Sequence, residues 1–231
     1  LSHAGVGSGV QGVFCQVGRL MLKLDLACGR APAPGFHGVD LHRDDCERVD
    51  LCRFPWPWVN ASAAELRCSH FIEHIPARAI VADDLFSHTF EEFTRSRHGE
   101  DLSQLRSRFV GEDMLCAFMD EAHRSLVPGG KLTVIAPHER SHGAFQDPTH
   151  RRYIVEETFY YFDRQWRLEN GVDHYTAHCD FEIHIALRAD PRREAAMTKL
   201  SKEEISHRWN LVDEIVCTMT KREALIARTT G

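Results

Sequence analysis

The chain lacks several features that define other classes of protein. None of its apolar runs approaches the roughly 20 residues that a membrane-spanning helix needs. Its eight cysteines are scattered and include no Cys-x-x-Cys pair, so neither a zinc site nor a disulfide framework is predicted. Basic residues are not in excess, since 28 Lys and Arg stand against 34 Asp and Glu. The net charge of −6 argues against a large non-specific nucleic-acid surface.

The first twenty residues lack the basic start and apolar core of a secretory signal. They are rich in Gly and Ser, and an apolar segment begins directly after Met21. We therefore expect residues 1–20 to be a loose N-terminal leader, with Met21 as a candidate natural start. Reduced, scattered cysteines favour a cytoplasmic location. No membrane partner is expected.

Alternating apolar patterns divide residues 21–231 into strands and helices of a single domain. The hydrophobic content of 43% is ordinary for a globular core. Polar stretches near 94–108 and 138–152 are predicted to be insertions. The pattern predicts an α/β fold, a doubly wound and mostly parallel seven-stranded sheet with an antiparallel far edge. The predicted strands are 21–27, 36–41, 47–51, 64–69, 131–137, 178–187 and 211–220, and the predicted helices are 71–92, 112–126, 155–163 and 201–208.

The segment from Leu22 to Asp40 is the most informative part of the chain. A short apolar strand ends at Asp25, a tight turn follows at Gly29, and a second short strand ends at Asp40. This order is typical of a nucleoside cofactor lying across the carboxyl edge of a parallel sheet. Gly29 has no side chain to block a ligand, and Asp40 is placed to accept hydrogen bonds from ribose hydroxyls. Pro32 and Pro34 predict a turn rather than a full helix between the strands.

This segment resembles the first two motifs of class I S-adenosylmethionine-dependent methyltransferases. Their first motif is Asp-x-Gly-x-Gly-x-Gly, of which residues 25–31 keep the acid and the middle glycine. Segments 48–58, 65–76 and 123–135 resemble later parts of the same family, in the same order. The resemblance covers about residues 21–187. It implies a Rossmann-like methyltransferase fold, transferase activity and S-adenosyl-L-methionine as cofactor.

The resemblance also implies which residues hold the cofactor. Three residues would come from the first turn and two from the end of the second strand. Two more would border the adenine, and two would lie at the end of the fourth strand. These residues are Asp25, Ala27, Gly29, Asp40, Leu41, Asp50, Leu51, Ser69 and His70.

Methyl transfer needs a positioned nucleophile, and a general base when the acceptor is a hydroxyl or a protonated amine. We expect the acceptor pocket above the carboxyl ends of the fourth and fifth strands. His150 is the first candidate for a base because imidazole titrates near neutrality, and His138 and His70 are the others. The alternative is that the 138–152 loop folds on itself, with Asp147 bonding backbone amides.

His70 and His74 are four residues apart, a spacing that also suits a pair of metal ligands. No third ligand is evident from the sequence, and Pro76 follows closely, so no metal is expected. A hydrogen-bond network at the start of a helix is the alternative role for Glu73 and His74.

The sequence therefore predicts an S-adenosylmethionine-dependent methyltransferase that acts on a small-molecule or sugar-containing (glycan) acceptor. One alternative is a non-catalytic cofactor-binding module of the same fold, favoured by the eroded first motif and disfavoured by the polar 138–152 loop. A nicotinamide-dependent oxidoreductase is less favoured because Gly-x-Gly-x-x-Gly is absent at 25–35. The acceptor atom and the oligomeric state do not follow from the sequence.

Overall fold

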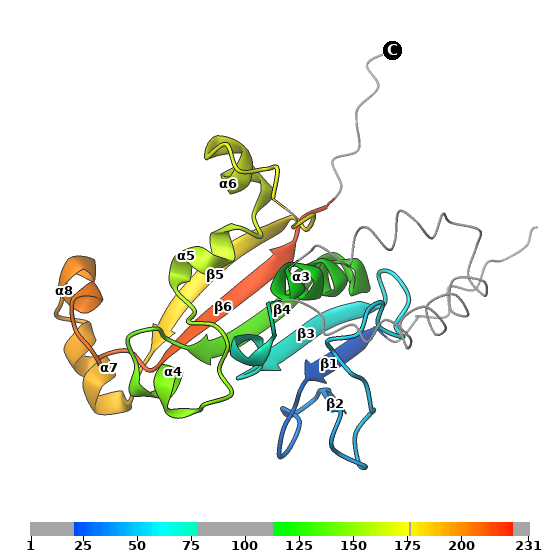
Figure 1. The fold of residues 1–231 in the computed structure, drawn as a ribbon, viewed down its shortest axis with the longest axis horizontal. Helices are drawn as coiled ribbons and strands as arrows, with labels where there is room; N and C mark the ends of the chain where they lie inside the picture. The colour runs from blue at the N-terminus through cyan, green and yellow to red at the C-terminus, as the bar shows by residue number, and fades with distance from the viewer. Residues whose placement is uncertain (1–20, 78–112, 176, 224–231) are drawn as a thin grey trace, which may run out of the picture.

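A computed structural model describes residues 21–77, 113–175 and 177–223 (Figure 1). The predicted leader at 1–20 and the insertion at 94–108 lie outside the described residues. The described strands form one sheet in the order β2-β1-β3-β4-β6-β5. Their bounds are β1 (Leu22–Leu26), β2 (His37–Val39), β3 (Ala63–Ser69), β4 (Leu126–Pro137), β5 (Phe181–Arg188) and β6 (Glu214–Lys221).

The sheet is parallel from β2 to β4, whereas β6 runs antiparallel to both of its neighbours. This confirms the mostly parallel sheet with an antiparallel far edge. Within the described ranges, no helix is both long and apolar enough to cross a membrane. The helical segments are η1 (Ile72–His74), α3 (Met114–Ser125), α4 (His142–Gln146), α5 (Glu156–Tyr160), α6 (Arg164–Glu169), α7 (Pro191–Met197) and α8 (Lys202–Ser206).

The predicted count of seven strands is not confirmed, because the described residues form six. The segment 47–51 adds only an isolated bridge between Val39 and Glu47. After that bridge the chain turns, since the Asp50 side chain accepts from the Cys52 amide at 3.0 Å and its carbonyl accepts from Arg53 at 3.0 Å. Prolines at 55 and 57 have no amide hydrogen to continue a ladder.

The prediction of a helix from residue 71 is wrong where the structure can test it. Only the single 3₁₀ turn η1 forms, and Ile75 is already extended, with ψ of 123°. Pro76 explains this, because the ring of a proline disfavours helical backbone at the preceding residue. The rest of the predicted 71–92 helix lies outside the described residues.

Helix α3 covers one face of the sheet and closes the core (Figure 1). It begins at Asp113, whose side chain accepts from the Leu115 amide at 2.9 Å, the usual N-cap arrangement. Its apolar side contributes Phe118, which meets Trp56 edge-on at 5.2 Å between ring centroids. The same core buries Leu24 and Leu66 of β1 and β3.

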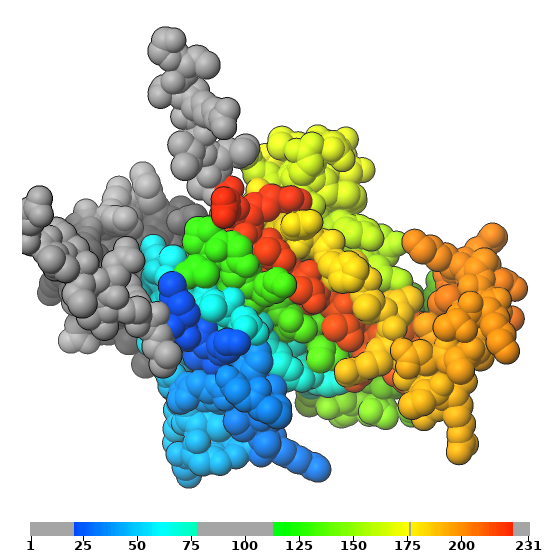
Figure 2. All heavy atoms as spheres, turned by 180° about the vertical axis from the view of Figure 1, so that it is seen from behind, coloured from blue at the N-terminus to red at the C-terminus, as the bar shows by residue number. Residues whose placement is uncertain are grey.

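The opposite face of β1 and β3 is polar. Lys23 pairs with Glu65, and the buried Asp25 pairs with Arg67 at 2.9 Å. Each pair is also a register pair of the parallel strands, so their side chains share one face. Figure 2, which views the molecule from behind, shows β1, β3, β4, β6 and β5 as successive bands of colour.

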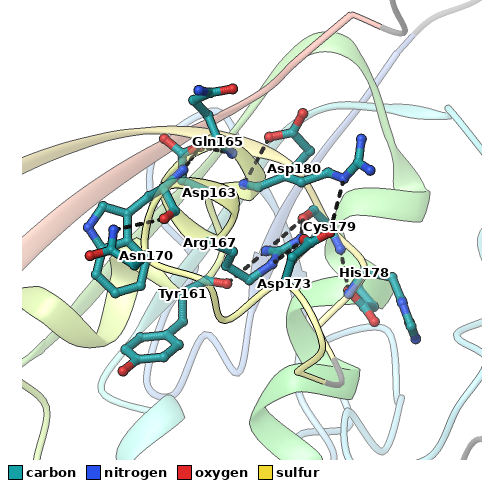
Figure 3. Close-up of polar contacts among 12 residues, drawn as sticks. Tyr161, Asp163, Gln165, Arg167, Asn170, Asp173, His178, Cys179 and Asp180 are labelled. Carbon is teal, nitrogen blue, oxygen red and sulfur yellow. Dashed lines mark hydrogen bonds and ion pairs between the residues drawn. The ribbon is translucent and has the colours of Figure 1, made fainter.

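A buried arginine fixes the far end of the molecule. Arg167 of α6 donates to the carbonyl oxygens of Tyr161 at 2.8 Å and Cys179 at 3.1 Å, and pairs with Asp173 at 3.2 Å (Figure 3). Such a buried guanidinium holds α6 against the segment that leads into β5. Removing it would leave several buried acceptors unpaired.

His123, near the end of α3, gives a test of this packing. Burial, with Lys221 nearby, lowers its pKa from 6.5 to about 4. Between pH 6.5 and about 4, His123 is therefore protonated in the unfolded chain but not in the folded chain. The free energy of unfolding falls as the pH drops through this range. In urea titrations at pH 7 and pH 5, His123→Gln should lose less stability between the two pH values than the wild type. Equal losses would contradict a half-buried His123 with a lowered pKa.

Candidate functional site

The turn after β1 is built on two residues with left-handed backbone. Ala27 has φ of +55° and Gly29 has φ of +60°. Beneath them, the buried Asp25 accepts from the Ala33 amide at 2.7 Å and pairs with Arg67. The Asp25 carboxylate thus shapes the 27–33 loop from below. A Cβ on Gly29 would meet nothing within 4 Å, so the space beside that residue is open.

Asp40 follows β2 and braces the same turn. Its Oδ2 accepts from the Gly29 amide at 3.1 Å, and its Oδ1 accepts from the His42 amide at 2.8 Å. Arg43 donates to the Gly29 carbonyl at 2.6 Å. The side chain of Asp40 is half-buried, and each carboxylate oxygen retains a lone pair for another donor. The structure therefore brings Asp25, Ala27, Gly29 and Asp40 together, as the sequence predicted.

The chain that follows this turn carries Leu41, predicted at the end of the second strand, and the two residues predicted for the adenine side. Leu41 is exposed, directly after Asp40. Leu51 is buried in the core, and its carbonyl accepts from the indole of Trp56 at 3.2 Å. Asp50 caps its own turn and pairs with Arg53 at 3.1 Å. Contact of these residues with a ligand stays a prediction.

A cavity of about 360 Å³ lies where β3 and β4 end and β6 begins. This is the place where the sequence predicted an acceptor pocket. Its lining side chains include four carboxylates and three imidazoles. The lining consists of His70, Glu73, His74, Pro137, Ser141, Gly143, Gln146, Asp147, His150, Asp213 and Glu214.

Two of the lining histidines have one ring nitrogen occupied. His150 Nδ1 lies 2.8 Å from the Ala144 carbonyl, which can only accept, so Nδ1 carries the proton. His74 Nδ1 lies 3.0 Å from the hydroxyl of Thr149, which itself donates to Asp147 at 2.7 Å. The single hydroxyl proton is thus used, and His74 Nδ1 is the donor. In the neutral form of each ring, Nε2 therefore keeps its lone pair.

His70 is held between two carboxylates at the end of β3. Its Nδ1 lies 3.5 Å from Glu73 and its Nε2 lies 2.7 Å from Glu214. Glu73 first, and Glu214 with it, raise the pKa of His70 above its ordinary value. Both ring nitrogens of His70 thus face carboxylates, and this geometry disfavours His70 as a general base. Ser69, just before it, ends β3 opposite Ile135.

His138 is buried at the end of β4 and is not among the described residues that line the cavity. Its Nδ1 accepts from the Arg140 amide at 3.1 Å and lies 2.9 Å from Glu139. Its other nitrogen lies 3.7 Å from Glu156. Of the three predicted bases, His150 and His70 thus reach the cavity.

The loop after β4 is fastened to the end of β3. The amides of Arg151 and Arg152 donate to the Glu73 carbonyl at 2.7 and 3.1 Å. The Arg152 guanidinium donates to the carbonyls of Ile75 and Pro76 and to Asp113. These contacts set His150 beside His74, with ring centroids 4.7 Å apart.

Asp213 and Glu214 were missed as site residues by the sequence reasoning. Both come from the start of β6, and Glu214 bridges His70 and Arg188. Because β6 is antiparallel to β4, its beginning lies where β4 ends. The signal was present in the sequence. The far edge was predicted to be antiparallel, and the acids at the start of its last strand are Asp213 and Glu214.

No family model and no curated protein matches this chain. Among solved structures, a SAM-dependent methyltransferase from Archaeoglobus fulgidus is similar over 88% of this chain and 87% of its own, with 14% identity and a TM-score of 0.48. An S-adenosylmethionine-dependent methyltransferase from Mesorhizobium loti matches over 87% and 91%, with 15% identity and a TM-score of 0.39. A phosphoethanolamine N-methyltransferase from Haemonchus contortus matches over 90% and 50%, with 14% identity and a TM-score of 0.36.

These proteins are methyltransferases of the kind that the sequence motifs resemble. Identities and TM-scores this low carry no argument about what this chain does.

The backbone of Ala27 offers a stability test of the first turn. A side chain in left-handed backbone costs roughly 1–2 kcal/mol, which glycine avoids. Ala27→Gly should therefore stabilise the protein by about 1 kcal/mol in denaturant unfolding, whereas Ala31→Gly, at a position without positive φ, should destabilise it. Destabilisation by both would show that Ala27 does not adopt this backbone.

Proposed function

We propose that this protein is a methyltransferase that binds S-adenosyl-L-methionine over the turn of residues 27–29 and a polar acceptor in the adjoining cavity. The observation that carries the proposal is the open left-handed turn at the carboxyl edge of the sheet, with Asp40 beside it. In parallel sheets of this kind, ligands bind outside the carboxyl ends of the strands. The cofactor would supply an electrophilic methyl group on a sulfonium.

The residues present fit a nucleoside cofactor. The space beside Gly29 is open, and the carboxylate of Asp40 is the kind of acceptor that ribose hydroxyls require. Ser69 and His70, at the end of β3, lie between this turn and the cavity in the strand order. They are the residues that we assign to the methionine end of the cofactor.

The cavity supports an acceptor that carries hydroxyl or amine groups. Its volume of about 360 Å³ falls in the range of small-molecule sites. Three of its groups carry lone pairs that can accept a proton or bind a cation. They are Nε2 of His74, Nε2 of His150 and the carboxylate of Glu73. A small molecule or a sugar-containing acceptor stays our prediction, as does a cytoplasmic location.

Two other functions are the alternatives. A non-catalytic module would bind the cofactor and transfer no methyl group to any acceptor. An oxidoreductase would bind a nicotinamide dinucleotide, whose pyrophosphate usually lies at the start of a helix. Here the described chain after β1 forms turns over residues 27–36 and no helix, which disfavours the oxidoreductase.

Binding of S-adenosylhomocysteine, measured by calorimetry in the presence of a chelator, tests the proposal. Asp40→Ala should weaken binding by roughly 1.5–3 kcal/mol, the range for hydrogen bonds to a charged group, or about 10- to 100-fold. Asp44→Ala is the matched control, because this carboxylate lies on the same loop, almost fully exposed.

Thermal unfolding of both variants checks that the turn survives, since Asp40 also braces Gly29. The wild type binding NADH but not S-adenosylhomocysteine would overturn the proposal. Equal affinity of a folded Asp40→Ala variant would remove Asp40 from the site.

A further inference from the structure

Glu73 is a buried carboxylate in the lining of the cavity. Its side chain is 1% exposed, and neither oxygen has a hydrogen-bond partner among the described residues. The ion pair with His70 is long, at 3.5 Å, and His70 is also engaged by Glu214 at 2.7 Å. A buried charge without close partners is costly, and such groups usually bind a counter-ion or a metal. Glu73 lines the cavity, where that partner can enter.

Two imidazoles complete a set of three possible ligands around this carboxylate. One nitrogen of His74, one nitrogen of His150 and one oxygen of Glu73 all lie within 4.8 Å of one another. Metal–ligand distances of about 2.1 Å require these atoms to close by only roughly 1 Å. Glu73 and His74 are consecutive in the chain, and the hydrogen bonds from Arg151 and Arg152 to the Glu73 carbonyl hold His150 beside them.

The partners of the two rings match those of metal-binding histidines. A histidine ligand usually donates its other N–H to a carbonyl or a carboxylate, which fixes the tautomer. His150 donates to the Ala144 carbonyl, and His74 donates to Thr149, which in turn donates to Asp147. In the neutral form, both rings therefore carry their free lone pair on Nε2, and these partners fix the orientation of the rings.

A second group of possible ligands, His138, Glu139 and Glu156, is less suited to an ion. The Nδ1 of His138 already accepts from a backbone amide, and Glu139 pairs with Arg140 at 3.1 Å. The other oxygen of Glu139 has no hydrogen-bond partner among the described residues, but no member of this group is among the described residues that line the cavity.

We propose that Glu73, His74 and His150 bind one divalent cation in the cavity. Two imidazoles and a carboxylate favour a borderline ion such as Zn²⁺, Co²⁺ or Fe²⁺ over Mg²⁺. Three protein ligands leave at least one coordination position for a molecule in the cavity. If the methyltransferase function proposed above holds, that molecule is an acceptor with an oxygen donor, and His150 acts as a cation ligand rather than as a general base.

The test uses the full chain without a histidine tag, stripped by a chelator and titrated with Co²⁺, Zn²⁺ and Mg²⁺ in the absence of cofactor. We expect one Co²⁺ or Zn²⁺ per chain, bound at least tenfold more tightly than Mg²⁺. Glu73→Gln and His150→Ala should each weaken Co²⁺ binding at least tenfold, and Thr149→Val, which removes the partner of His74, should weaken it about 10-fold. His207→Ala, an exposed histidine on another surface, and His138→Gln should bind as the wild type does.

Paramagnetic shifts in the wild-type protein give the same answer without relying on folded variants. Bound Co²⁺ should shift the ring resonances of His74 and His150 and leave those of His207 in place. The proposal is overturned if the chain binds no Co²⁺ or Zn²⁺, if Mg²⁺ binds as tightly, or if the shifted rings are others. Because calorimetry with S-adenosylhomocysteine is done in chelator, failure of the cation site and failure of the cofactor site are separate results.

Discussion

The attachment of the 147–152 loop to the end of β3 is the contact on which the cavity depends. Two backbone amides share the Glu73 carbonyl, and the Arg152 guanidinium donates to the carbonyls of Ile75 and Pro76 and to Asp113. Charge-assisted hydrogen bonds to several acceptors hold a loop far better than a single neutral one. The result is that groups from the segment after β3, from the loop after β4 and from the start of β6 line one cavity.

Charge is arranged differently in the two halves of the site. Under the 27–33 turn, the buried Asp25 has Arg67 and a backbone amide as partners, so its charge is compensated within the fold. In the cavity, Glu73 is equally buried, but its only ion pair among the described residues is the long one of 3.5 Å with His70, and neither of its oxygens accepts a hydrogen bond from them. The paired Asp25 carboxylate shapes a loop, whereas a cationic ligand would stabilise the buried Glu73 carboxylate. This contrast is the physical basis for locating the chemistry near Glu73.

The sequence predicted those features of the fold and of the site that are encoded by neighbouring residues. The acids that end β1 and β2, the glycine turn, the short connection at 28–35 and the antiparallel far edge all follow from residue spacing. The prediction of a strand at 47–51 was wrong. The Asp50 side chain and the nearby prolines favour a turn there over hydrogen bonds between strands. The sequence did not reveal His150 as a candidate ligand beside His74, because the two are far apart in the chain. Hydrogen bonds such as that from Arg152 to the Ile75 carbonyl bring their segments together. Glu214 required the sheet topology, which places the start of β6 beside the end of β4.

A crystal structure with bound S-adenosylhomocysteine would test the central claim most directly, because that claim joins one turn and one cavity into a single site. The account predicts ribose hydroxyls on the carboxylate of Asp40, the backbone of Gly29 against the ligand, and the sulfur directed past Ser69 and His70 toward the cavity. A ligand bound elsewhere, or a sulfur facing away from Glu73 and His150, would contradict it.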